Sequence, residues 1–419
     1  MLLKEWPPFL KRIIYNTKNM ELLEFFLKVL AYIIYTYFTA STIYVLVFAI
    51  AGFGYKKNRN NSARNKSSIA VFIPAYKEDA VIVEVAKEAL KQQYEVGKFD
   101  VVVIADSLKE TTILALKALP IILIEVSFKE STKAKALNQA LSELQKKYDY
   151  ALILDADNVM EPNFMNKINN AFQKGYQVVQ GHRKAKNRNT SFAILDGASE
   201  EINNHLFRKG HRALGLSSGL IGSGMGFNYP LFKSIMKEVN AIGGFDKELE
   251  FQFAKRGIVV EYLNDAIVLD EKIQKANDFA VQRRRWLSTQ FIYLKKYFVT
   301  GCKELVRNGN INFFDKVLQM IIPPRVLLLG ITLLIALGYG LAVVTFDFSA
   351  QMMFQKWILN LFLIGLAYLL ALPKSFYQFT TLKALLSLPN AFFKMLLLLF
   401  KLKGANKKFI HTTHGITQN

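Results

Sequence analysis

The sequence predicts an α/β protein in which a mostly parallel sheet flanked by helices is combined with membrane-spanning and interfacial helices. Between residues 69 and 154, short apolar runs alternate with longer amphipathic segments, which is the rhythm of βαβ units. Outside this region, residues 29–55, 326–346 and 357–373 carry no charged side chain. A membrane helix needs roughly 20 apolar residues, with about 17 as the lower limit. Each run is therefore long enough to span a bilayer, in keeping with the mean hydropathy of +0.17.

The expected elements of the sheet domain follow in chain order. Strands are expected at residues 69–73, 100–105 and 121–126, and a further strand begins at Tyr150 and ends just before Asp155. Helices are expected at residues 79–93 and 109–119, and from Ser131 or Thr132 to residue 147. Beyond Asp157 the pattern becomes mixed, with a long polar helix expected around residues 191–212.

The same patterns divide the whole chain. We expect an interfacial segment at 1–28, a membrane helix at 29–55, a linker at 56–68, the α/β domain at 69–275, interfacial helices at 276–325, membrane helices at 326–346 and 357–373, and an amphipathic helix with a basic tail at 381–419. The first apolar run lacks the short core and cleavage site of a signal peptide, so we interpret it as retained. In the last segment Lys394 would lie mid-bilayer at a cost of about 3 kcal/mol, which favours an interfacial helix over residues 381–402.

The formal net charge of +21 could indicate a nucleic-acid partner. Many basic residues instead stand beside the apolar runs, at positions 56–66 and 401–408, where an anionic leaflet attracts each with about 1 kcal/mol. No zinc-finger, RNA-recognition or helix-turn-helix signature is present. The expected partner is therefore a lipid bilayer and not nucleic acid. The single cysteine, Cys302, excludes an internal disulfide and a multi-cysteine metal site, as is typical of a cytosol-facing enzyme.

Two acids one residue apart, Asp155 and Asp157, follow the apolar strand that begins at Tyr150. The carboxyl edge of an open α/β sheet is where such folds bind ligands. Paired carboxylates there provide hard oxygen ligands for Mg²⁺ or Mn²⁺, which can in turn hold a diphosphate. A strand-end turn with solvated acids is the alternative for this pair alone.

Further motifs stand in a fixed order around this Asp-x-Asp pair. They are Pro74-Ala-Tyr-Lys-Glu78, Asp106-Ser107, Lys133-Ala-Lys-Ala-Leu-Asn138, Gly222-Ser-Gly-Met-Gly226, Phe245-Asp246-Lys-Glu248-Leu249 and Gln282-x-x-Arg285-Trp286. In this order, beside these apolar runs, the chain resembles the membrane-embedded, processive-type family 2 glycosyltransferases, which include cellulose, chitin, hyaluronan and poly-N-acetylglucosamine synthases. The resemblance covers about residues 69–290 and implies a GT-A-type nucleotide-sugar transferase domain.

The resemblance assigns the first motifs to a nucleotide-sugar pocket. Glu78 and Asp106 would accept hydrogen bonds from a uracil or ribose, and Lys133 would place a cation and a helix N-terminus near the diphosphate. The pocket residues it implies are Pro74, Tyr76, Glu78, Asp106, Lys133 and Asp155. Taken singly, Lys133 could be a solvated helix-start lysine and Glu78 a first-turn acid that complements a helix dipole.

The same resemblance makes Asp157 the metal ligand, with Asp155 assisting through the ribose or a water molecule. The divalent cofactor, Mg²⁺ or Mn²⁺, would neutralise the charge that builds on the departing nucleoside diphosphate. His182 is a further candidate ligand, although a lone histidine near a strand end is more often an ordinary polar residue.

Transfer with inversion needs a base that takes the proton of the acceptor hydroxyl. The family places an aspartate in a Glu-Asp pair at a helix start, and Asp246 matches it, although Phe245 replaces the preceding acid. That replacement removes a charge that would raise the pKa of the aspartate. It leaves Asp246 and Glu248 as alternatives for the base. A third interpretation is that Asp246 only caps a helix at residues 247–255.

Gln282, Arg285 and Trp286 are spaced by three and four residues and share one helix face. Arginine can bind a pyrophosphate bidentately, and tryptophan offers a flat face to a sugar ring. We therefore place all three among the catalytic residues with Asp246; a basic membrane-anchoring helix is the alternative. The segment 222–226 lacks the Lys-Ser/Thr of a phosphate loop and is expected to allow close backbone approach near an acceptor channel.

The predicted function is an inverting, metal-dependent hexosyltransferase that adds sugars from a UDP-sugar to a growing polysaccharide at the cytosolic face of the cell (inner) membrane. The nearest alternative is transfer of one sugar to a lipid, ceramide- or polyprenol-linked. A more remote one is a non-catalytic membrane scaffold, which the intact Asp155, Asp157, Asp246 and Arg285 disfavour. The sequence does not identify the sugar, the linkage or an export partner.

Overall fold

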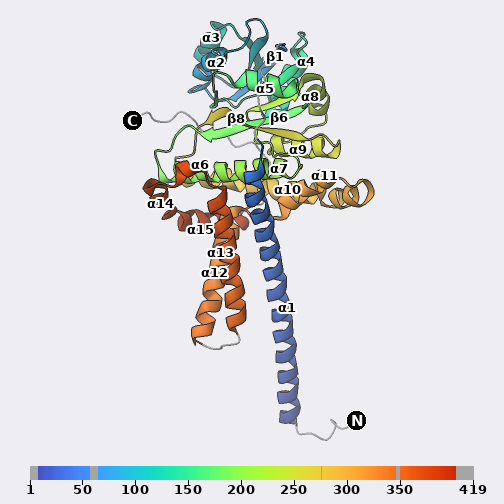
Figure 1. Ribbon diagram of the computed structural model, residues 1–419, viewed down its shortest axis with the longest axis vertical. Coiled ribbons are helices and arrows are strands. Elements are labelled where there is room, and N and C mark those ends of the chain that lie inside the picture. The colour runs from blue at the N-terminus through green and yellow to red at the C-terminus, as the bar shows by residue number, and fades with distance from the viewer. Residues whose placement is uncertain (1–7, 57–64, 275, 346–349, 403–419) are drawn as a thin grey trace. The chain divides into compact units, whose positions relative to one another are not determined.

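The computed structural model describes residues 8–56, 65–274, 276–345 and 350–402. The chain forms two compact units (Figure 1). One consists of Val47–Leu327 with Ala367–Asn419 and contains the sheet. The other consists of Met1–Leu46 with Leu328–Leu366 and contains most of the apolar helices.

The sheet has eight strands in the order β3-β2-β1-β4-β7-β6-β8-β5. Its strands are β1 (Ile69–Tyr76), β2 (Phe99–Asp106), β3 (Ile122–Val126), β4 (Tyr150–Ile153), β5 (Val159–Met160), β6 (Val178–Ala185), β7 (Met225–Asn228) and β8 (Val260–Asp270). Strands β3, β2, β1 and β4 are mutually parallel, as the sequence predicts. Strand β7 runs antiparallel to both β4 and β6, and β5 runs antiparallel to β8. The fold is a mixed α/β sheet whose first half is parallel.

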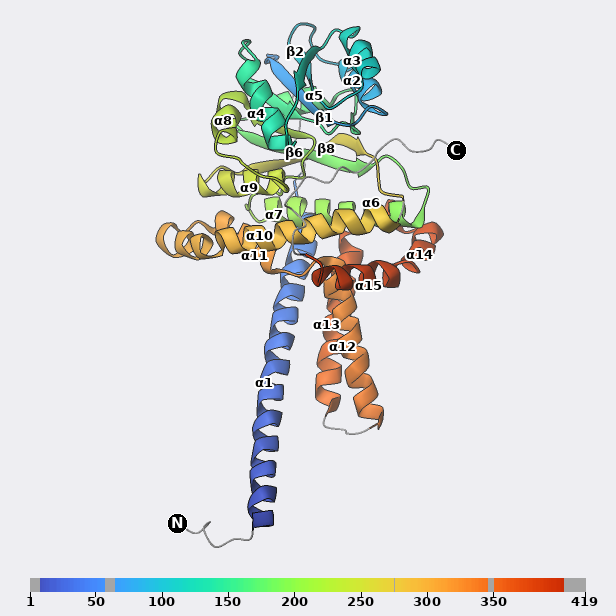
Figure 2. The same ribbon diagram turned by 180° about the vertical axis from the view of Figure 1, so that it is seen from behind.

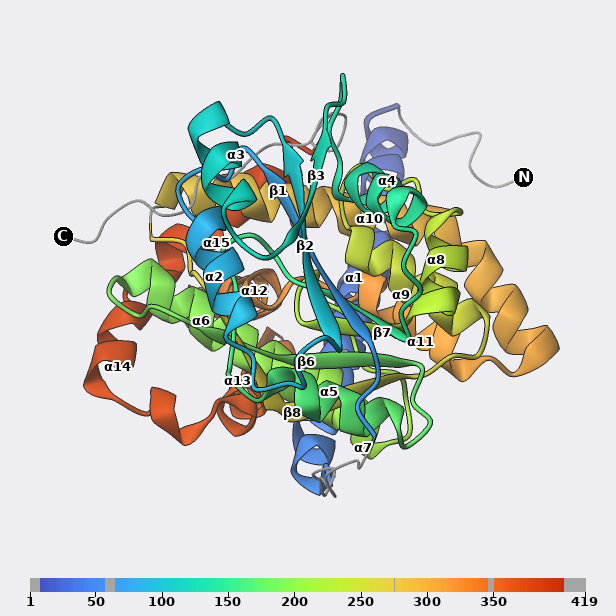
Figure 3. The same cartoon turned by 90° about the horizontal axis from the view of Figure 1, so that it is seen from above.

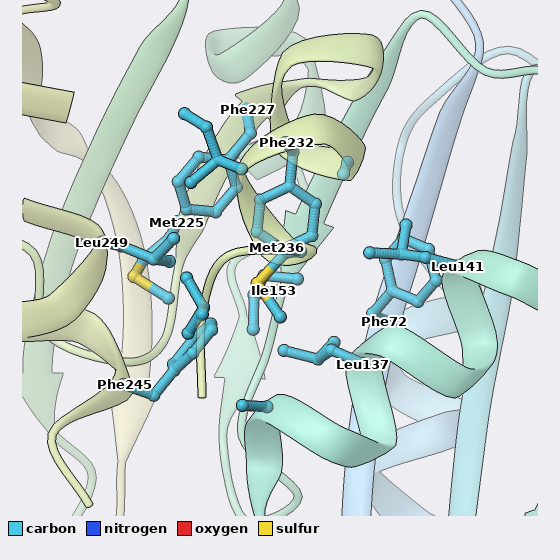
Figure 4. Close-up of a cluster of buried hydrophobic side chains, with 14 of the residues drawn as sticks. Phe72, Leu137, Leu141, Ile153, Met225, Phe227, Phe232, Met236, Phe245 and Leu249 are labelled. Atoms are coloured by element: carbon cyan, nitrogen blue, oxygen red, sulfur yellow. The ribbon is translucent and has the colours of Figure 1, made fainter. Parts of the chain in front are cut away.

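Helices cover both faces of the parallel half because its strands are apolar on both sides. They are α2 (Ile82–Leu90), α3 (Glu110–Lys117), α4 (Lys133–Glu143), α5 (Phe164–Phe172), α8 (Tyr229–Met236) and α9 (Phe245–Lys255). Seen from above, α2 and α3 lie on one side of β1 and β2, and α4, α8 and α9 lie on the other (Figure 3). The buried side chains accordingly form two hydrophobic clusters, one on each face; Figure 4 shows the cluster that α4, α8 and α9 share with the sheet.

This unit contains further helices. They are α6 (Ser191–Asn203), a π-helical segment (Asn204–Gly210), α7 (His211–Ala213), α10 (Ala276–Asn308), α11 (Ile311–Ile321), α14 (Phe379–Leu385) and α15 (Leu388–Leu399). Of these, α6 and the π-helical segment contact the second half of the sheet, and the others pack mainly on helices. Helix α10 contacts α9, α11 and α15 (Figure 2). The helix expected at 191–212 is present, with a π-helical stretch inside it. The helix expected at 381–402 is broken into α14 and α15, which are bent by 41°.

Among the described residues, three helices are long and apolar enough to cross a membrane: α1 (Pro8–Ala51), from Met20 on, α12 (Arg325–Thr345) and α13 (Gln351–Ala371). The bent pair of α14 and α15 would be a fourth if it forms one span. The sequence suggested a change from a surface segment to a membrane helix at residue 28, whereas α1 continues through it. Lys28 and Glu24 form an exposed i,i+4 ion pair of 2.6 Å, an arrangement that supports a helix. In the same unit Trp357 packs edge-on against Tyr35 and Phe38. The expected tail at 403–419 and linker residues 57–64 lie outside the described residues.

Candidate active site

Strands β1 and β2 end side by side, because Tyr76 and Asp106 are register partners. The next residue on each chain segment, Lys77 and Ser107, has a φ of 58°. A left-handed conformation is uncommon outside glycine and is retained only where the surroundings impose it. The amide of Lys77 donates a hydrogen bond of 3.1 Å to the Asp106 carbonyl, which ties the two turns together. Asp106 is buried and Glu78 is half-buried just beyond β1.

Pro74 lies inside β1 although proline has no N–H to donate to a sheet. The carbonyl of Phe72 accepts a hydrogen bond from Leu154, so this side of β1 faces β4. Pro74, two residues on, faces the same side, but the pairing of β1 with β4 ends at Phe72. The missing donor therefore falls where β1 has no partner strand on that side, next to the end of β4 that leads to Asp155.

Asp155 and Asp157 follow β4 as the sequence predicts. Asp155 donates its amide hydrogen to Ser223 Oγ at 3.0 Å, and its side chain is about one-third exposed. Asp157 is buried. Residues 222–224 run beside this pair, since the Gly224 amide donates to the Ile153 carbonyl at 2.9 Å. Gly222 adopts a φ of 84° close to Asp155, where only glycine is comfortable. The glycine segment thus lies against the acid pair.

Lys133 is the first residue of α4, whose N-terminus is capped by Thr132. Its ammonium donates hydrogen bonds to the Asp155 carboxylate and, at 2.7 Å, to the Gly222 carbonyl. It also lies 5.6 Å from the ring centre of Phe245. Lys133 is therefore directed into the acid site and is not a solvated helix-start lysine.

Asp246 is in the first turn of α9, which begins one residue earlier. Phe245 is a core residue that packs with Leu249 and Met225 (Figure 4), so helix geometry sends the next side chain away from the core. Loss of hydration raises the pKa of the Asp246 carboxyl above its usual value, and nearby Lys247 and Lys133 oppose the rise. The sequence linked a raised pKa to a neighbouring acid that this chain lacks. In this protein, burial raises the pKa of Asp246 instead.

Glu248, the alternative base, is buried and held by α10. It accepts hydrogen bonds from Tyr297 Oη at 2.7 Å and from Lys296 Nζ at 2.8 and 2.9 Å. These bonds occupy both carboxylate oxygens. Glu248 therefore joins α9 to α10, and Asp246 is the acid directed toward the site.

Gln282, Arg285 and Trp286 all lie on α10. Burial lowers the pKa of the Arg285 guanidinium, and electrostatic attraction to the carboxylates of Asp246 and Asp155 opposes this. The Trp286 side chain is 38% exposed, and the guanidinium carbon of Arg283 lies 4.2 Å from its ring centre. Gln282 Oε1 is buried without a hydrogen-bond partner among the described residues.

Gly244 brings α9 and α10 into close contact. Its φ is 68°, and a Cβ atom there would lie 2.3 Å from Thr289 Cγ2 on α10. Thr289 is one helical turn beyond Arg285, whose carbonyl accepts a hydrogen bond from the Thr289 hydroxyl at 2.9 Å. The absence of a side chain at residue 244 thus sets the separation between Asp246 and Arg285.

Gly244→Ala is expected to lower both the melting temperature and the turnover, because the added methyl must push α9 away from α10. Gly257→Ala is a matched control at the other end of α9: its φ is 69°, but no atom lies within 4 Å of the added methyl. Both variants bear the left-handed strain of about 1 kcal/mol, and only the first bears the clash. Thermal unfolding and steady-state turnover of both variants test this. Equal losses in the two would contradict the proposed close contact.

His182 does not join the acid pair. Its Nδ1 lies 3.0 Å from the Asn264 carbonyl, and its Nε2 lies 3.0 Å from Glu201. With both ring nitrogens engaged by protein groups, the ordinary polar interpretation holds. Asp270 is likewise in a buried ion network, paired with Lys272 and, at 3.8 Å, with Arg183.

The donor set at the strand edge fits a divalent cation that is shared with a ligand. Asp155 and Asp157 supply hard oxygen atoms, and Asp155 already binds a positive group, the Lys133 ammonium. Among the described residues, no cluster of three or more His, Cys, Asp or Glu side chains could hold a metal ion. The remaining ligands would therefore come from a diphosphate and water.

Two contributions to this site were not apparent from single motifs. Ser223 supports Asp155 from inside the glycine segment. Arg283 forms a buried ion pair with Asp196 of α6 and so fixes the start of α10 beside the site. The run of three arginines at 283–285 was the sequence signal for the role of Arg283. Only the fold shows that Arg283 anchors α10 whereas Arg285 faces the acids of the site.

The mixed α/β sheet, flanked by helices and with acidic side chains at the ends of its parallel strands, has the architecture of a GT-A-type fold. Residues 66–289, just over half of the chain, match the family described as "Glycosyltransferase like family 2". The chain belongs to this family. The sequence matches no curated protein.

Solved structures with a similar fold include a mannosyltransferase from Pyrobaculum calidifontis in complex with GDP-Man and Mn²⁺. It is 14% identical, with a TM-score of 0.46, over 79% of this chain and 99% of that one. Glucosyl-3-phosphoglycerate synthase from Mycobacterium tuberculosis, bound to Mn²⁺, UDP and glucosyl-3-phosphoglycerate, is 16% identical, with a TM-score of 0.36, over 51% and 75%. S. aureus TarS is 14% identical, with a TM-score of 0.36, over 74% and 50%.

Proposed function

We propose that this protein transfers a sugar, with inversion, from a UDP-sugar to a growing polysaccharide at the cytosolic face of a membrane. The observation that carries the proposal is a convergence of charged groups from separate elements. Asp155 follows β4, Lys133 begins α4, Asp246 lies in the first turn of α9 and Arg285 lies on α10. Two acids and two cations brought together at the ligand-binding edge of the sheet suit a negatively charged donor and a proton transfer.

In the proposed donor pocket, Glu78 and Asp106 accept hydrogen bonds from the uracil or ribose. Asp106 ends β2 and Glu78 lies two residues beyond the end of β1, and the two strands end in register, so one nucleoside can reach both. Pro74 and Tyr76 line the same strand end. Lys133 and Arg285 bind the diphosphate, and the fork of the arginine matches its oxygen atoms.

Asp157, assisted by Asp155, would hold the divalent cation, Mg²⁺ or Mn²⁺. When bound, the cation neutralises charge on the departing diphosphate, so the protein has no need to protonate that group. Asp155 also keeps its backbone bond to Ser223, which fixes the direction of the acid pair.

Asp246 is the proposed general base. Its carboxylate takes the proton from the acceptor hydroxyl as that oxygen attacks the anomeric carbon of the donor, and the nucleoside diphosphate leaves. The raised pKa of Asp246 suits this role, since a more basic carboxylate accepts the proton more readily. Arg285, close to both Asp246 and Asp155, stabilises the negative charge that shifts from acceptor to diphosphate.

A panel of nucleotide sugars tests the proposed donor. The purified chain with Mn²⁺ should release UDP from one UDP-sugar faster than it releases GDP from any GDP-sugar. Release from a GDP-sugar alone would overturn the assignment of the uracil pocket. Release from neither, by folded protein with acceptor present, would support the scaffold alternative.

Trp286 is the proposed platform for the terminal sugar of the acceptor, since its ring is partly exposed on the helix face that carries Arg285. Trp286→Ala is expected to shorten products and to raise the apparent KM for acceptor about tenfold, because an aromatic contact is worth about 1 kcal/mol or somewhat more. Trp286→Phe keeps an aromatic ring and should recover most of the length. Product sizing and UDP-sugar hydrolysis, measured side by side, are the readouts. An equal loss of hydrolysis and length would place Trp286 at the donor instead.

Membrane insertion through α1, α12 and α13 is also part of the proposal. In a Cys302→Ser background, single cysteines at Lys56 and Lys401 are expected to be labelled from the cytosol, and one at Ala350 from the opposite side. These positions bracket the apolar helices. Labelling of Lys401 from outside would mean that α14 and α15 together cross the membrane.

A further inference from the structure

The Lys133 ammonium is bound to Asp155, one of the two acids of the proposed metal site. It contacts the Asp155 carboxylate and the Gly222 carbonyl, and only one-fifth of its side chain is exposed. The ring of Phe245 lies on another side of it, at 5.6 Å. Carboxylate, carbonyl and aromatic face are all groups that attract a cation. Lys133 is thus held in a partly enclosed cation site of the protein's own making.

This position has a consequence for metal binding. A divalent cation on Asp155 and Asp157 would compete with the ammonium for the Asp155 oxygen atoms and would be repelled by its charge at close range. To leave the Asp155 carboxylate, Lys133 needs a stronger anion in the site than the Asp246 carboxyl that already lies near it. A nucleoside diphosphate supplies one, because its phosphate oxygen atoms can accept hydrogen bonds from the ammonium and also ligate the metal.

We propose that Lys133 is a built-in cation that fills the metal site of the nucleotide-free protein, so that the divalent ion and the nucleoside diphosphate bind together. The inference rests on the proposed function and adds to it an order of events. The diphosphate draws the ammonium away from Asp155, and the metal takes the vacated oxygen atoms. Because coupling between two ligands is reciprocal, metal must tighten UDP binding by the same factor by which UDP tightens metal binding.

The test is the binding of Mn²⁺ to the full-length protein in detergent, measured by electron paramagnetic resonance with and without saturating UDP. In the wild type, UDP is expected to tighten Mn²⁺ binding at least tenfold. Lys133→Met removes the competing charge, so Mn²⁺ binding without UDP should tighten about tenfold and the gain from UDP should shrink. Lys133→Arg keeps the cation and should resemble the wild type without UDP.

Lys135→Met is the matched control. Lys135 is in the same first turn of α4, but its ammonium donates to the Glu130 carbonyl on the exposed side of the helix. Its substitution should leave Mn²⁺ binding unchanged in both conditions. Asp157→Asn should lose Mn²⁺ binding in both, which identifies the site being measured.

The outcomes separate this inference from the function on which it rests. If Lys133→Met, with an unaltered melting temperature, binds Mn²⁺ without UDP no better than the wild type, the built-in cation is refuted while UDP-dependent metal binding stands. The same holds if Lys133→Arg behaves like Lys133→Met, because charge would then be irrelevant. If the wild type binds no Mn²⁺ even with UDP, both the inference and the proposed metal dependence fall.

Discussion

Asp246→Asn is expected to lower the rate of sugar transfer by about 10²–10⁴-fold, the usual contribution of a general base, while UDP binding changes little. The amide has nearly the shape of the carboxylate but cannot take the proton of the acceptor hydroxyl. The substitution should not unfold the protein. Burial raises the pKa of Asp246, so the ionised form is a cost to the folded state at neutral pH, and asparagine avoids it.

Glu248→Gln is the matched control on the same helix. It weakens the contacts of α9 with Lys296 and Tyr297, so the expected effect is a lower melting temperature with a smaller loss of turnover. Transfer rates, UDP affinity and thermal unfolding of the two variants are the measurements. A greater loss of turnover in Glu248→Gln than in Asp246→Asn would show that the base is assigned to the wrong acid.

The pH profile provides a second measurement on Asp246. A base must be ionised to act, so kcat/KM falls as the pH drops through its pKa in the free enzyme. Because burial raises that pKa, the acid limb should lie at higher pH than an exposed aspartate would give. Asp246→Asn should remove this limb from the residual activity.

Asp157→Ala is expected to lower activity by several orders of magnitude, the second large effect. Asp157 is buried just beyond the end of β4, and among the described residues no cluster of three or more His, Cys, Asp or Glu side chains could take over its role. Chelation by EDTA should inactivate the wild type to a similar extent, and added Mn²⁺ should restore only the wild type.

Glu125→Gln provides the control for Asp157→Ala. Glu125 is an acid on the edge strand β3 that is exposed and pairs with Lys117. Its loss should leave activity and membrane insertion unchanged, since a surface ion pair contributes little. Near-normal turnover of Asp157→Ala, or of EDTA-treated protein, would remove the metal from the proposed mechanism.

The parallel half of the fold could be predicted because its strands bury both faces. Strand β1 is a run of apolar residues, and the amphipathic helices between strands carry a different period, so both signals were local. The second half gave weaker signals. Strand β5 has two residues, and the register of β6 with β8 shifts between Gly181 and His182. Such irregularities depend on tertiary pairing and leave no clear period in the sequence.

Long helices were predictable in extent but not in continuity. A surface segment was expected to end at residue 28, yet Lys28 pairs with Glu24 along α1, which continues unbroken through this position. The π-helical segment at Asn204–Gly210 has no composition that sets it apart from the α-helix on either side. The Phe48 carbonyl packs closely against this segment: a Cβ atom on Gly210 would lie 2.4 Å from the carbonyl oxygen. The sequence does not reveal this contact.

The sequence singled out the residues of the site more readily than their partners. Asp155, Asp157 and Arg285 stand in recognisable motifs. Three features of the site depend on contacts with distant segments of the chain. Glu248 is bound by α10, Phe245 belongs to the core, and Lys133 is bound to Asp155. The raised pKa of Asp246 depends on tertiary structure as well, because burial raises it although Phe245 replaces the neighbouring acid.

We propose that this chain builds a polysaccharide from a UDP-sugar. The measurement that tests it most directly is to incubate the purified protein in lipid with Mn²⁺ and the radiolabelled UDP-sugar that it hydrolyses, and to size the product. The account predicts a polymer of many sugars that is absent with Asp246→Asn and shorter with Trp286→Ala. A product that never exceeds one sugar on a lipid, whatever acceptor is supplied, would contradict polymer synthesis and favour single-sugar transfer.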